Sequence, residues 1–434
     1  MKIDKKSNVF NADTLIWFQI YYNIFVKFAI HNFKMPTVLN YVSDTITIIL
    51  FFVLLTGKKK IKITRQSICM CVICALFFTW GYISLVLNGG NLLLYLWALR
   101  NYGRFFLWFF CCIHLLDFSK WETHITKLHY ILYFNMMLMV FQYFVQNERM
   151  DYLNGFFGRY VGGNSAINTF IVALTAENIA ALLSKKREFK KVLINILIML
   201  VTCALNEIKI YFLELIMIVI IALLIDSKNT ATHLFRFFKI LVGFTLLAIL
   251  GVFVFICLYP DFAENLNIEY FIYYSTRSFN SSTLIYHKGI PVVNRLTVYH
   301  IVNKYFLKDV ISKICGLGMG AADTSVYISN TFYHSYAPVS YSAFLYGLIF
   351  LENGIIGLSI YISFFLYVIC ESMRKKKSCF GKYERIISGT VASLGIVMGI
   401  YNSALKIESS GYMFFVFLSI MFAEKIRKQS VDDN

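Results

Sequence analysis

The chain has 434 residues, of which 58% are hydrophobic and only 15% are charged, with a mean hydropathy of +0.64. Soluble domains carry about 25% charged residues, and apolar runs of roughly 20 residues recur along the whole chain, so a soluble globular protein is excluded. The formal net charge of +17 would suggest a nucleic-acid partner in a soluble protein. Here the basic residues cluster in short loops between apolar runs, as the topology rule for Lys and Arg requires, and we expect no nucleic-acid partner.

Twelve apolar segments are predicted to be membrane-spanning helices, because a helix satisfies every backbone polar group within lipid. The predicted spans are 13–30, 37–56, 67–87, 92–116, 129–146, 164–183, 192–205, 210–225, 240–259, 353–371, 386–404 and 411–423. The predicted fold class is therefore all-α, a polytopic transmembrane bundle of about 12 spans with one large extracytoplasmic loop. It divides into a bundle of about nine spans at 1–259, the loop at 260–340 and the C-terminal spans at 341–434.

The basic residues predict the orientation. They gather in seven segments that all fall on one side of a twelve-span arrangement, whereas the loop at 260–340 is nearly balanced, with six Lys and Arg against five Asp and Glu. Because cytoplasmic loops carry the excess of Lys and Arg, we expect a multi-pass protein of the cytoplasmic membrane with both termini inside and the long loop outside. The basic segments include Lys58-Lys59-Lys60, Lys185-Lys186-Arg187 and Arg374-Lys375-Lys376-Lys377.

The ten cysteines lie mostly in apolar runs. Cys69, Cys71 and Cys74 have a spacing that a metal or redox cluster uses, but no His or carboxylate stands near them, so we interpret them as apolar packing residues. We expect neither a metal nor another cofactor. No signal-peptide cleavage site follows the first apolar run.

The segment 260–340 is the longest interruption between apolar runs, and it has too many aromatic and apolar residues to be disordered. We expect it to fold as an extramembrane cap. Apolar residues at helical spacing predict a helix over 291–314. Gly316, Gly318 and Gly320 then predict a tight turn whose backbone N–H groups face an anion. His334 is the best general-base candidate because His titrates near neutral pH, and His287 and His300 compete with it.

Arginines also occur inside a predicted span, where ionisable residues are functional hypotheses by default. Arg100 and Arg104 are four residues apart and share one helix face. They can form a pyrophosphate clamp, because Arg binds phosphate oxygens bidentately. The alternative is a structural pair with Glu177 or another buried carboxylate.

Two short polar stretches lie on the predicted outer side. Asn206-Glu-Ile-Lys209 forms a very short connection between two short spans, so it either lines a site or simply places charges at the interface. Arg159 precedes Gly162-Gly163-Asn164, where two glycines allow close approach of a ligand or a neighbouring helix.

Together these residues resemble the bacterial O-antigen polymerase (Wzy) and O-antigen ligase family, whose members combine many spans with one large periplasmic loop late in the chain. The resemblance covers most of the chain. The matching pieces are Arg159 with Gly162-Gly163-Asn164, Asn206-Glu-Ile-Lys209, Asn294-Arg295, Gly316-Leu-Gly-Met-Gly320 and Leu351-Glu-Asn-Gly-Ile-Ile-Gly357. Tyr341-Ser342 stand where many ligases have a His-Asn pair, which favours a polymerase.

The resemblance implies a glycosyltransferase that joins undecaprenyl-pyrophosphate-linked repeat units into an O-antigen or capsule polysaccharide. The expected catalytic residues are Arg295, His334 and Lys209. The expected substrate-binding residues are Arg159, Arg100, Arg104, Asn164, Gly318 and Glu352. The expected partners are the lipid-linked oligosaccharide, membrane lipid and a chain-length regulator protein. Two alternatives stay open, an O-antigen ligase that transfers glycan to lipid A core and a flippase or other transporter of lipid-linked oligosaccharide.

Overall fold

The computed structural model describes residues 12–57, 64–149, 152–160, 162–226, 231–260, 286–325, 327–374 and 381–432. The protein is all-α, with twelve long helices in the described residues and a single two-stranded hairpin among them. The long helices are α1 (Ala12–Asn32), α2 (Val42–Thr56), α3 (Arg65–Leu87), α4 (Leu92–Leu115), α5 (Trp121–Phe144), α6 (Gly163–Leu183), α7 (Phe189–Leu205), α8 (Ile210–Asp226), α9 (Ala231–Leu258), α14 (Leu345–Met373), α15 (Lys382–Tyr401) and α16 (Glu408–Asp432).

Each of the twelve segments predicted from hydropathy overlaps one of these twelve helices, although several segments extend past the ends of their helices. In the part of the chain that the structure describes, five helices are apolar and long enough to cross a membrane by length and composition, which indicates a membrane protein. These five are Thr37–Thr56, Arg65–Leu87, Gly163–Leu183, Ile240–Leu258 and Leu345–Met373. The count of twelve spans and the orientation of the termini stay predictions.

Helix α6 lies in the middle of the bundle, with 94% of its apolar span buried. It packs against α7, α8, α15 and α16. Its sequence is rich in Ala, Thr and Asn, and small residues of this kind let neighbouring helices approach closely within a membrane. By contrast, α2, α3 and α9 expose most of their apolar spans, as helices that face lipid do.

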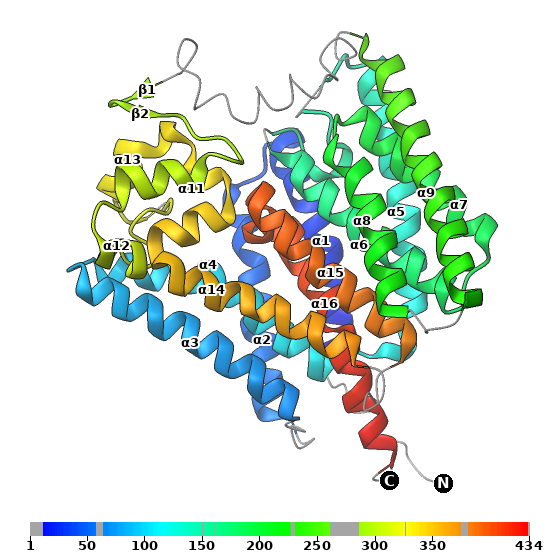
Figure 1. Cartoon of the computed structure of the whole chain (residues 1–434), viewed down its shortest axis with the longest axis horizontal. Helices are drawn as coiled ribbons and strands as arrows, with labels where there is room; N and C mark the ends of the chain where they lie inside the picture. Colours follow the sequence, from blue (N-terminus) through cyan, green and yellow to red (C-terminus); the bar gives the residue numbers. More distant parts are fainter. Residues whose placement is uncertain are drawn as a thin grey trace.

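The cap is folded in its described part, 286–325 and 327–340; residues 261–285 lie outside the described ones. It contains short elements that gather at one edge of the molecule, next to α3 and α14 (Figure 1). They are β1 (Tyr286–His287), β2 (Ile290–Pro291), α11 (Val298–Ile301), a π-helical turn (Val302–Phe306), α12 (Val310–Cys315) and α13 (Thr331–Tyr336).

The single helix predicted over 291–314 is wrong in its start and its continuity. The Asn294 N–H donates to Thr297 Oγ1 at 2.8 Å, so a turn precedes α11. Leu307 then leaves the helical conformation, and Asp309 starts α12 with a reciprocal capping box with Ser312. Local side-chain hydrogen bonds of this kind compete with a continuous helix.

Helix α14 is broken at Gly354, whose φ of 62° and ψ of −167° are not helical. A Cβ atom at this position would lie 2.2 Å from the Ile314 carbonyl oxygen, so only glycine fits. The 19 residues of 355–373 span roughly 28 Å at about 1.5 Å per residue. That length alone matches a hydrocarbon core of about 30 Å, so the part of α14 after the break is long enough to cross a membrane by itself.

Candidate functional site

The connection between α15 and α16 brings together polar side chains from distant parts of the chain. It contains the 3₁₀ turn Ala404–Lys406. The Arg295 guanidinium of the cap lies 4.1 Å from the Tyr401 ring centre. Arg104 of α4 donates to the Lys406 carbonyl oxygen at 3.0 Å, and the Lys406 ammonium pairs with Asp323 of the cap.

Arg295 and Lys209, two of the three expected catalytic residues, act on each other electrostatically. Lys209 occupies the turn between α7 and α8, and its exposed side chain places Nζ 5.6 Å from the Phe255 ring centre. Partial desolvation lowers the pKa of Lys209, Glu207 opposes this shift, and the positive charge of Arg295 adds to it. The cap and the α7–α8 turn therefore each contribute a cation, and the two cations influence one another.

The arginine pair of α4 is held by carboxylates. Arg100 Nε donates to Asp44 Oδ2 at 2.9 Å, and its Nη2 pairs with the same oxygen. Arg104 Nη1 lies 2.7 Å from Glu408 Oε1 and 3.4 Å from Asp44 Oδ1. This is the structural pairing that the sequence left open, with Asp44 and Glu408 as partners. Glu177 instead receives two hydrogen bonds from Arg187, at 2.7 and 3.0 Å.

The glycine turn has the backbone conformation that its sequence predicts. Gly316, Gly318 and Gly320 have φ values of 77°, 103° and 86°. The Gly318 N–H donates to the Glu352 carbonyl oxygen at 2.9 Å, and the Ala322 N–H donates to Glu352 Oε1 at 3.1 Å. The acidic group that this turn meets is therefore the fully buried side chain of Glu352 itself. In this structure Gly318 and Glu352 hold the cap on α14.

Arg159 and Asn164 flank the start of α6. Arg159 is largely exposed, and its Nη1 lies 2.9 Å from Glu148 Oε1. Asn164 is half-buried in the first helical turn. The group that approaches Gly163 closely is part of the protein and not a ligand, because a Cβ on Gly163 would lie 2.5 Å from Asn154 Nδ2.

The three histidine candidates of the cap have different surroundings. His334 is exposed on α13. His287 Nε2 lies 2.8 Å from the Ser335 carbonyl oxygen, which links the hairpin to α13. His300 lies beside a pocket. None of the hydrogen bonds found within the described ranges joins His334 to Arg295.

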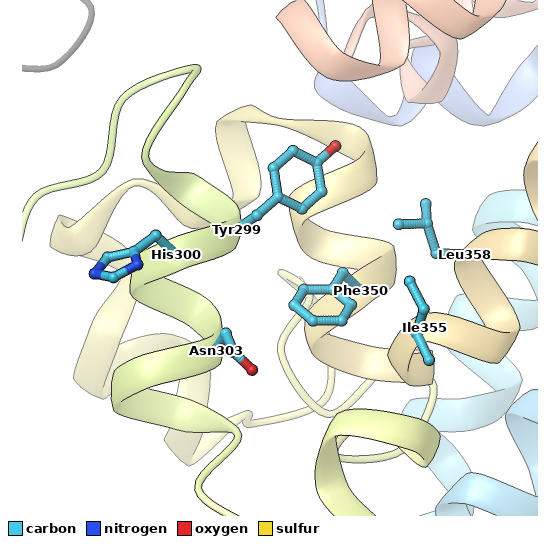
Figure 2. A pocket seen from close by; sticks show the side chains of 6 residues that line it. All are labelled: Tyr299, His300, Asn303, Phe350, Ile355 and Leu358. Carbon is cyan, nitrogen blue, oxygen red and sulfur yellow. The ribbon is translucent and has the colours of Figure 1, made fainter. Parts of the chain in front are cut away.

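A pocket of about 350 Å³ lies between α11 and α14, lined by Tyr299, His300, Asn303, Phe350, Ile355 and Leu358. In Figure 2 the Tyr299 and Phe350 rings lie between His300 on one side and Ile355 and Leu358 on the other. The two ring centres are 6.2 Å apart. Ile355 is half exposed, so the pocket opens at the flank of α14. Its apolar and aromatic lining suits a hydrocarbon chain or the apolar face of a sugar.

Sequence reasoning missed the partners of the arginines. Their partner Asp44 lies within a predicted span, as does the nearby cation Lys27, whereas Glu408 lies just before the last predicted span and Asp323 lies in the cap. A search for intramembrane charges that require partners would have found Asp44 and Lys27. Among the described residues, no three His, Cys, Asp or Glu side chains gather as a metal site requires.

No protein-family model matches this chain, and no curated protein sequence matches it.

Proposed function

We propose that the protein is an integral-membrane glycosyltransferase of the cytoplasmic membrane that polymerises a surface polysaccharide. Its substrates would be repeat units linked to undecaprenyl pyrophosphate, and it would act on the outer side, with both termini in the cytoplasm. The observation that carries the proposal is the position of Arg295, which reaches from the cap over Tyr401 of α15 and whose charge acts on Lys209 of the α7–α8 turn. Two cations that act on each other favour binding of a polyanion.

The proposed reaction needs an anion-binding site more than it needs a strong acid. The acceptor hydroxyl attacks the anomeric carbon of the donor sugar, and the bond from that carbon to the pyrophosphate oxygen breaks. The hydroxyl proton passes to a base, for which His334 is the proposed group. Arg295 and Lys209 would stabilise the negative charge that develops on the leaving pyrophosphate. Arg159, Arg100, Arg104 and Asn164 are proposed to bind and orient the substrate, and a chain-length regulator protein is a proposed partner.

The pocket at α14 supports a lipid-linked substrate. It lies at the break at Gly354: Ile355 and Leu358 follow the break in α14, and Phe350 precedes it. The other three lining residues belong to the cap. A polyprenyl chain in the bilayer can therefore reach the pocket from the side while its head group faces the cap.

A transporter of lipid-linked oligosaccharide is the second candidate, because the broken helix α14 is a feature of many transporters. Transporter breaks lie near the bilayer midplane, where they form the substrate site. The break at Gly354 leaves a complete span on one side, so its position supports the enzyme more than the transporter.

The purified protein in proteoliposomes, supplied with undecaprenyl-pyrophosphate-linked repeat units, tests the proposal. We expect a ladder of polymers on glycan gels. In cells, loss of a polymerase leaves a single repeat on the core, loss of a ligase leaves polymer that is not attached to the core, and loss of a transporter leaves lipid-linked repeats inside. Polymer of normal length in cells lacking the protein would refute the polymerase.

A further inference from the structure

Several hydrogen-bond donors around the start of α16 are incompletely paired in the described part of the chain. The buried Tyr160 and Ser409 hydroxyls interact with each other, and beyond this contact they have no partner; the buried Arg104 Nε has none. Lys27 is half-buried, and none of the ion pairs found among the described residues includes it. Buried polar groups are normally paired, so a cluster of incompletely paired donors indicates a missing acceptor.

These four groups lie close to one another. Lys27 Nζ is 5.9 Å from the Tyr160 ring centre, and it interacts electrostatically with Glu408 and Arg104. The Tyr160 hydroxyl interacts with the Ser409 hydroxyl and with the Glu408 charge. Burial raises the pKa of Tyr160 to about 12, so its hydroxyl stays protonated at neutral pH and can donate.

The charges of this region do not balance. Among the described residues of this cluster, Lys27, Arg100 and Arg104 carry three positive charges, while Asp44 and Glu408 carry two negative ones. One positive charge is therefore in excess in a largely buried environment, where an uncompensated charge is costly. The N-terminal turn of α16, a helix of 25 residues, adds its positive dipole end.

The local backbone holds the donors in place and leaves them reachable. A Cβ on Gly158 would lie 2.7 Å from the Lys27 carbonyl, and Gly158 has φ +90°, so the segment that ends in Tyr160 packs tightly on α1. His31, one turn after Lys27, stacks on the Tyr160 ring with centres 5.1 Å apart. The side chains of Arg100 and Glu408 are 26% and 18% exposed, so the cluster is not sealed.

We propose that Lys27, Tyr160, Ser409 and Arg104 form a binding site for a phosphate group. This site is separate from the contacts of Arg295 and Lys209, and Lys27 supplies its excess charge. The assignment to a lipid-linked phosphate rests on the proposed function. The same donors would also bind a free phosphate or pyrophosphate, because both kinds of ligand present phosphate oxygens as hydrogen-bond acceptors.

Binding measurements on the purified full chain in detergent test this site. The probes are undecaprenyl pyrophosphate, undecaprenol, sodium pyrophosphate and sodium phosphate. We expect undecaprenyl pyrophosphate to bind more tightly than undecaprenol. Lys27→Gln should weaken that binding by at least about tenfold, as loss of a charge-assisted hydrogen bond implies. Lys34→Gln removes an exposed cation just after α1 and serves as the matched control that binds like the wild type.

Tyr160→Phe keeps the ring and removes only the hydroxyl, so it tests the site even where Lys27→Gln lowers expression. Binding of pyrophosphate but not of the lipid would support the site and assign it to a free anion. Binding by Lys27→Gln and Tyr160→Phe within about twofold of the wild type would overturn it. If Lys27→Gln weakens binding but the wild type makes no polymer, the proposed function alone is refuted. If the wild type makes polymer and Lys27→Gln binds and polymerises as well as the wild type, the site alone is refuted.

Discussion

At the scale of single residues, Arg295 combines a ring contact with a neighbouring like charge. Its guanidinium lies over Tyr401, and its charge acts on Lys209. An anion that binds between the two cations would relieve their repulsion, so the repulsion favours the state in which an anionic substrate is bound. A guanidinium is suited to this position because its planar fork can stack on a ring and bind two phosphate oxygens.

We therefore expect Arg295→Ala to abolish polymer formation while protein abundance stays near normal. Arg295→Lys should restore only part of the activity, because Lys keeps the charge but loses the fork and the stacking. The measurement is the ladder of polymer lengths in cells that express each variant at matched levels. Normal chain lengths in Arg295→Ala would remove this residue from the site.

Arg104 belongs to a different environment, because its side chain is only 7% exposed and bonds to Glu408 and Asp44. Removing one partner of a buried pair typically costs about 3–5 kcal/mol. We expect Arg104→Ala to lower the thermal stability of the purified protein clearly, and Arg100→Ala, at 26% exposure, to lower it less. Unchanged stability of Arg104→Ala together with lost carrier binding would instead support the clamp.

The shared helix face of Arg100 and Arg104 could be predicted from their spacing in the sequence. Their carboxylate partners could not be predicted. Asp44 is 60 residues before Arg104, and Glu408 is 304 residues after it. Contacts across such separations depend on how the helices pack, which a single sequence does not encode in its local pattern.

At the scale of elements, the break in α14 depends on Gly354. The positive φ and the close Ile314 carbonyl both exclude a side chain. We expect Gly354→Ala to lower the free energy of unfolding by more than about 1 kcal/mol. Gly243→Ala in α9 is the matched control, since a Cβ there meets nothing within 4 Å and Ala favours a helix. Equal thermal stability of the two variants would contradict the requirement for glycine.

Hydropathy located the long helices because burial in lipid or in the bundle demands long apolar runs. Periodicity failed for the short elements of the cap. There the turn at Asn294 and the capping box of Asp309 interrupt a helical pattern of apolar residues. Such hydrogen bonds depend on three or four neighbouring residues, so a pattern of apolar residues over a window of 24 positions does not predict them.

At the scale of the whole molecule, composition predicts an all-α membrane protein but not which helices form the centre. Helices α1, α15 and α16 lie in the middle of the view in Figure 1, between the cap and the group α5, α7 and α9. The central α6 differs from the lipid-facing helices chiefly in its small and polar residues, which lower its mean hydropathy. Its position follows from close packing, not from hydrophobicity.

The proposed orientation is the last prediction, and it rests on basic residues of which many, such as Lys58-Lys59-Lys60, lie outside the described residues. Lys190 at the start of α7 and Lys308 in the cap are both exposed and belong to opposite sides of the twelve-span arrangement. The rule for Lys and Arg places Lys190 in the cytoplasm. In a background where the native cysteines are replaced, Lys308→Cys should react with an impermeant maleimide in intact cells. Lys190→Cys should react only after the membrane is opened. Labelling of both positions from outside would refute the arrangement, and with it the placement of Arg295 and Lys209 at an outer site.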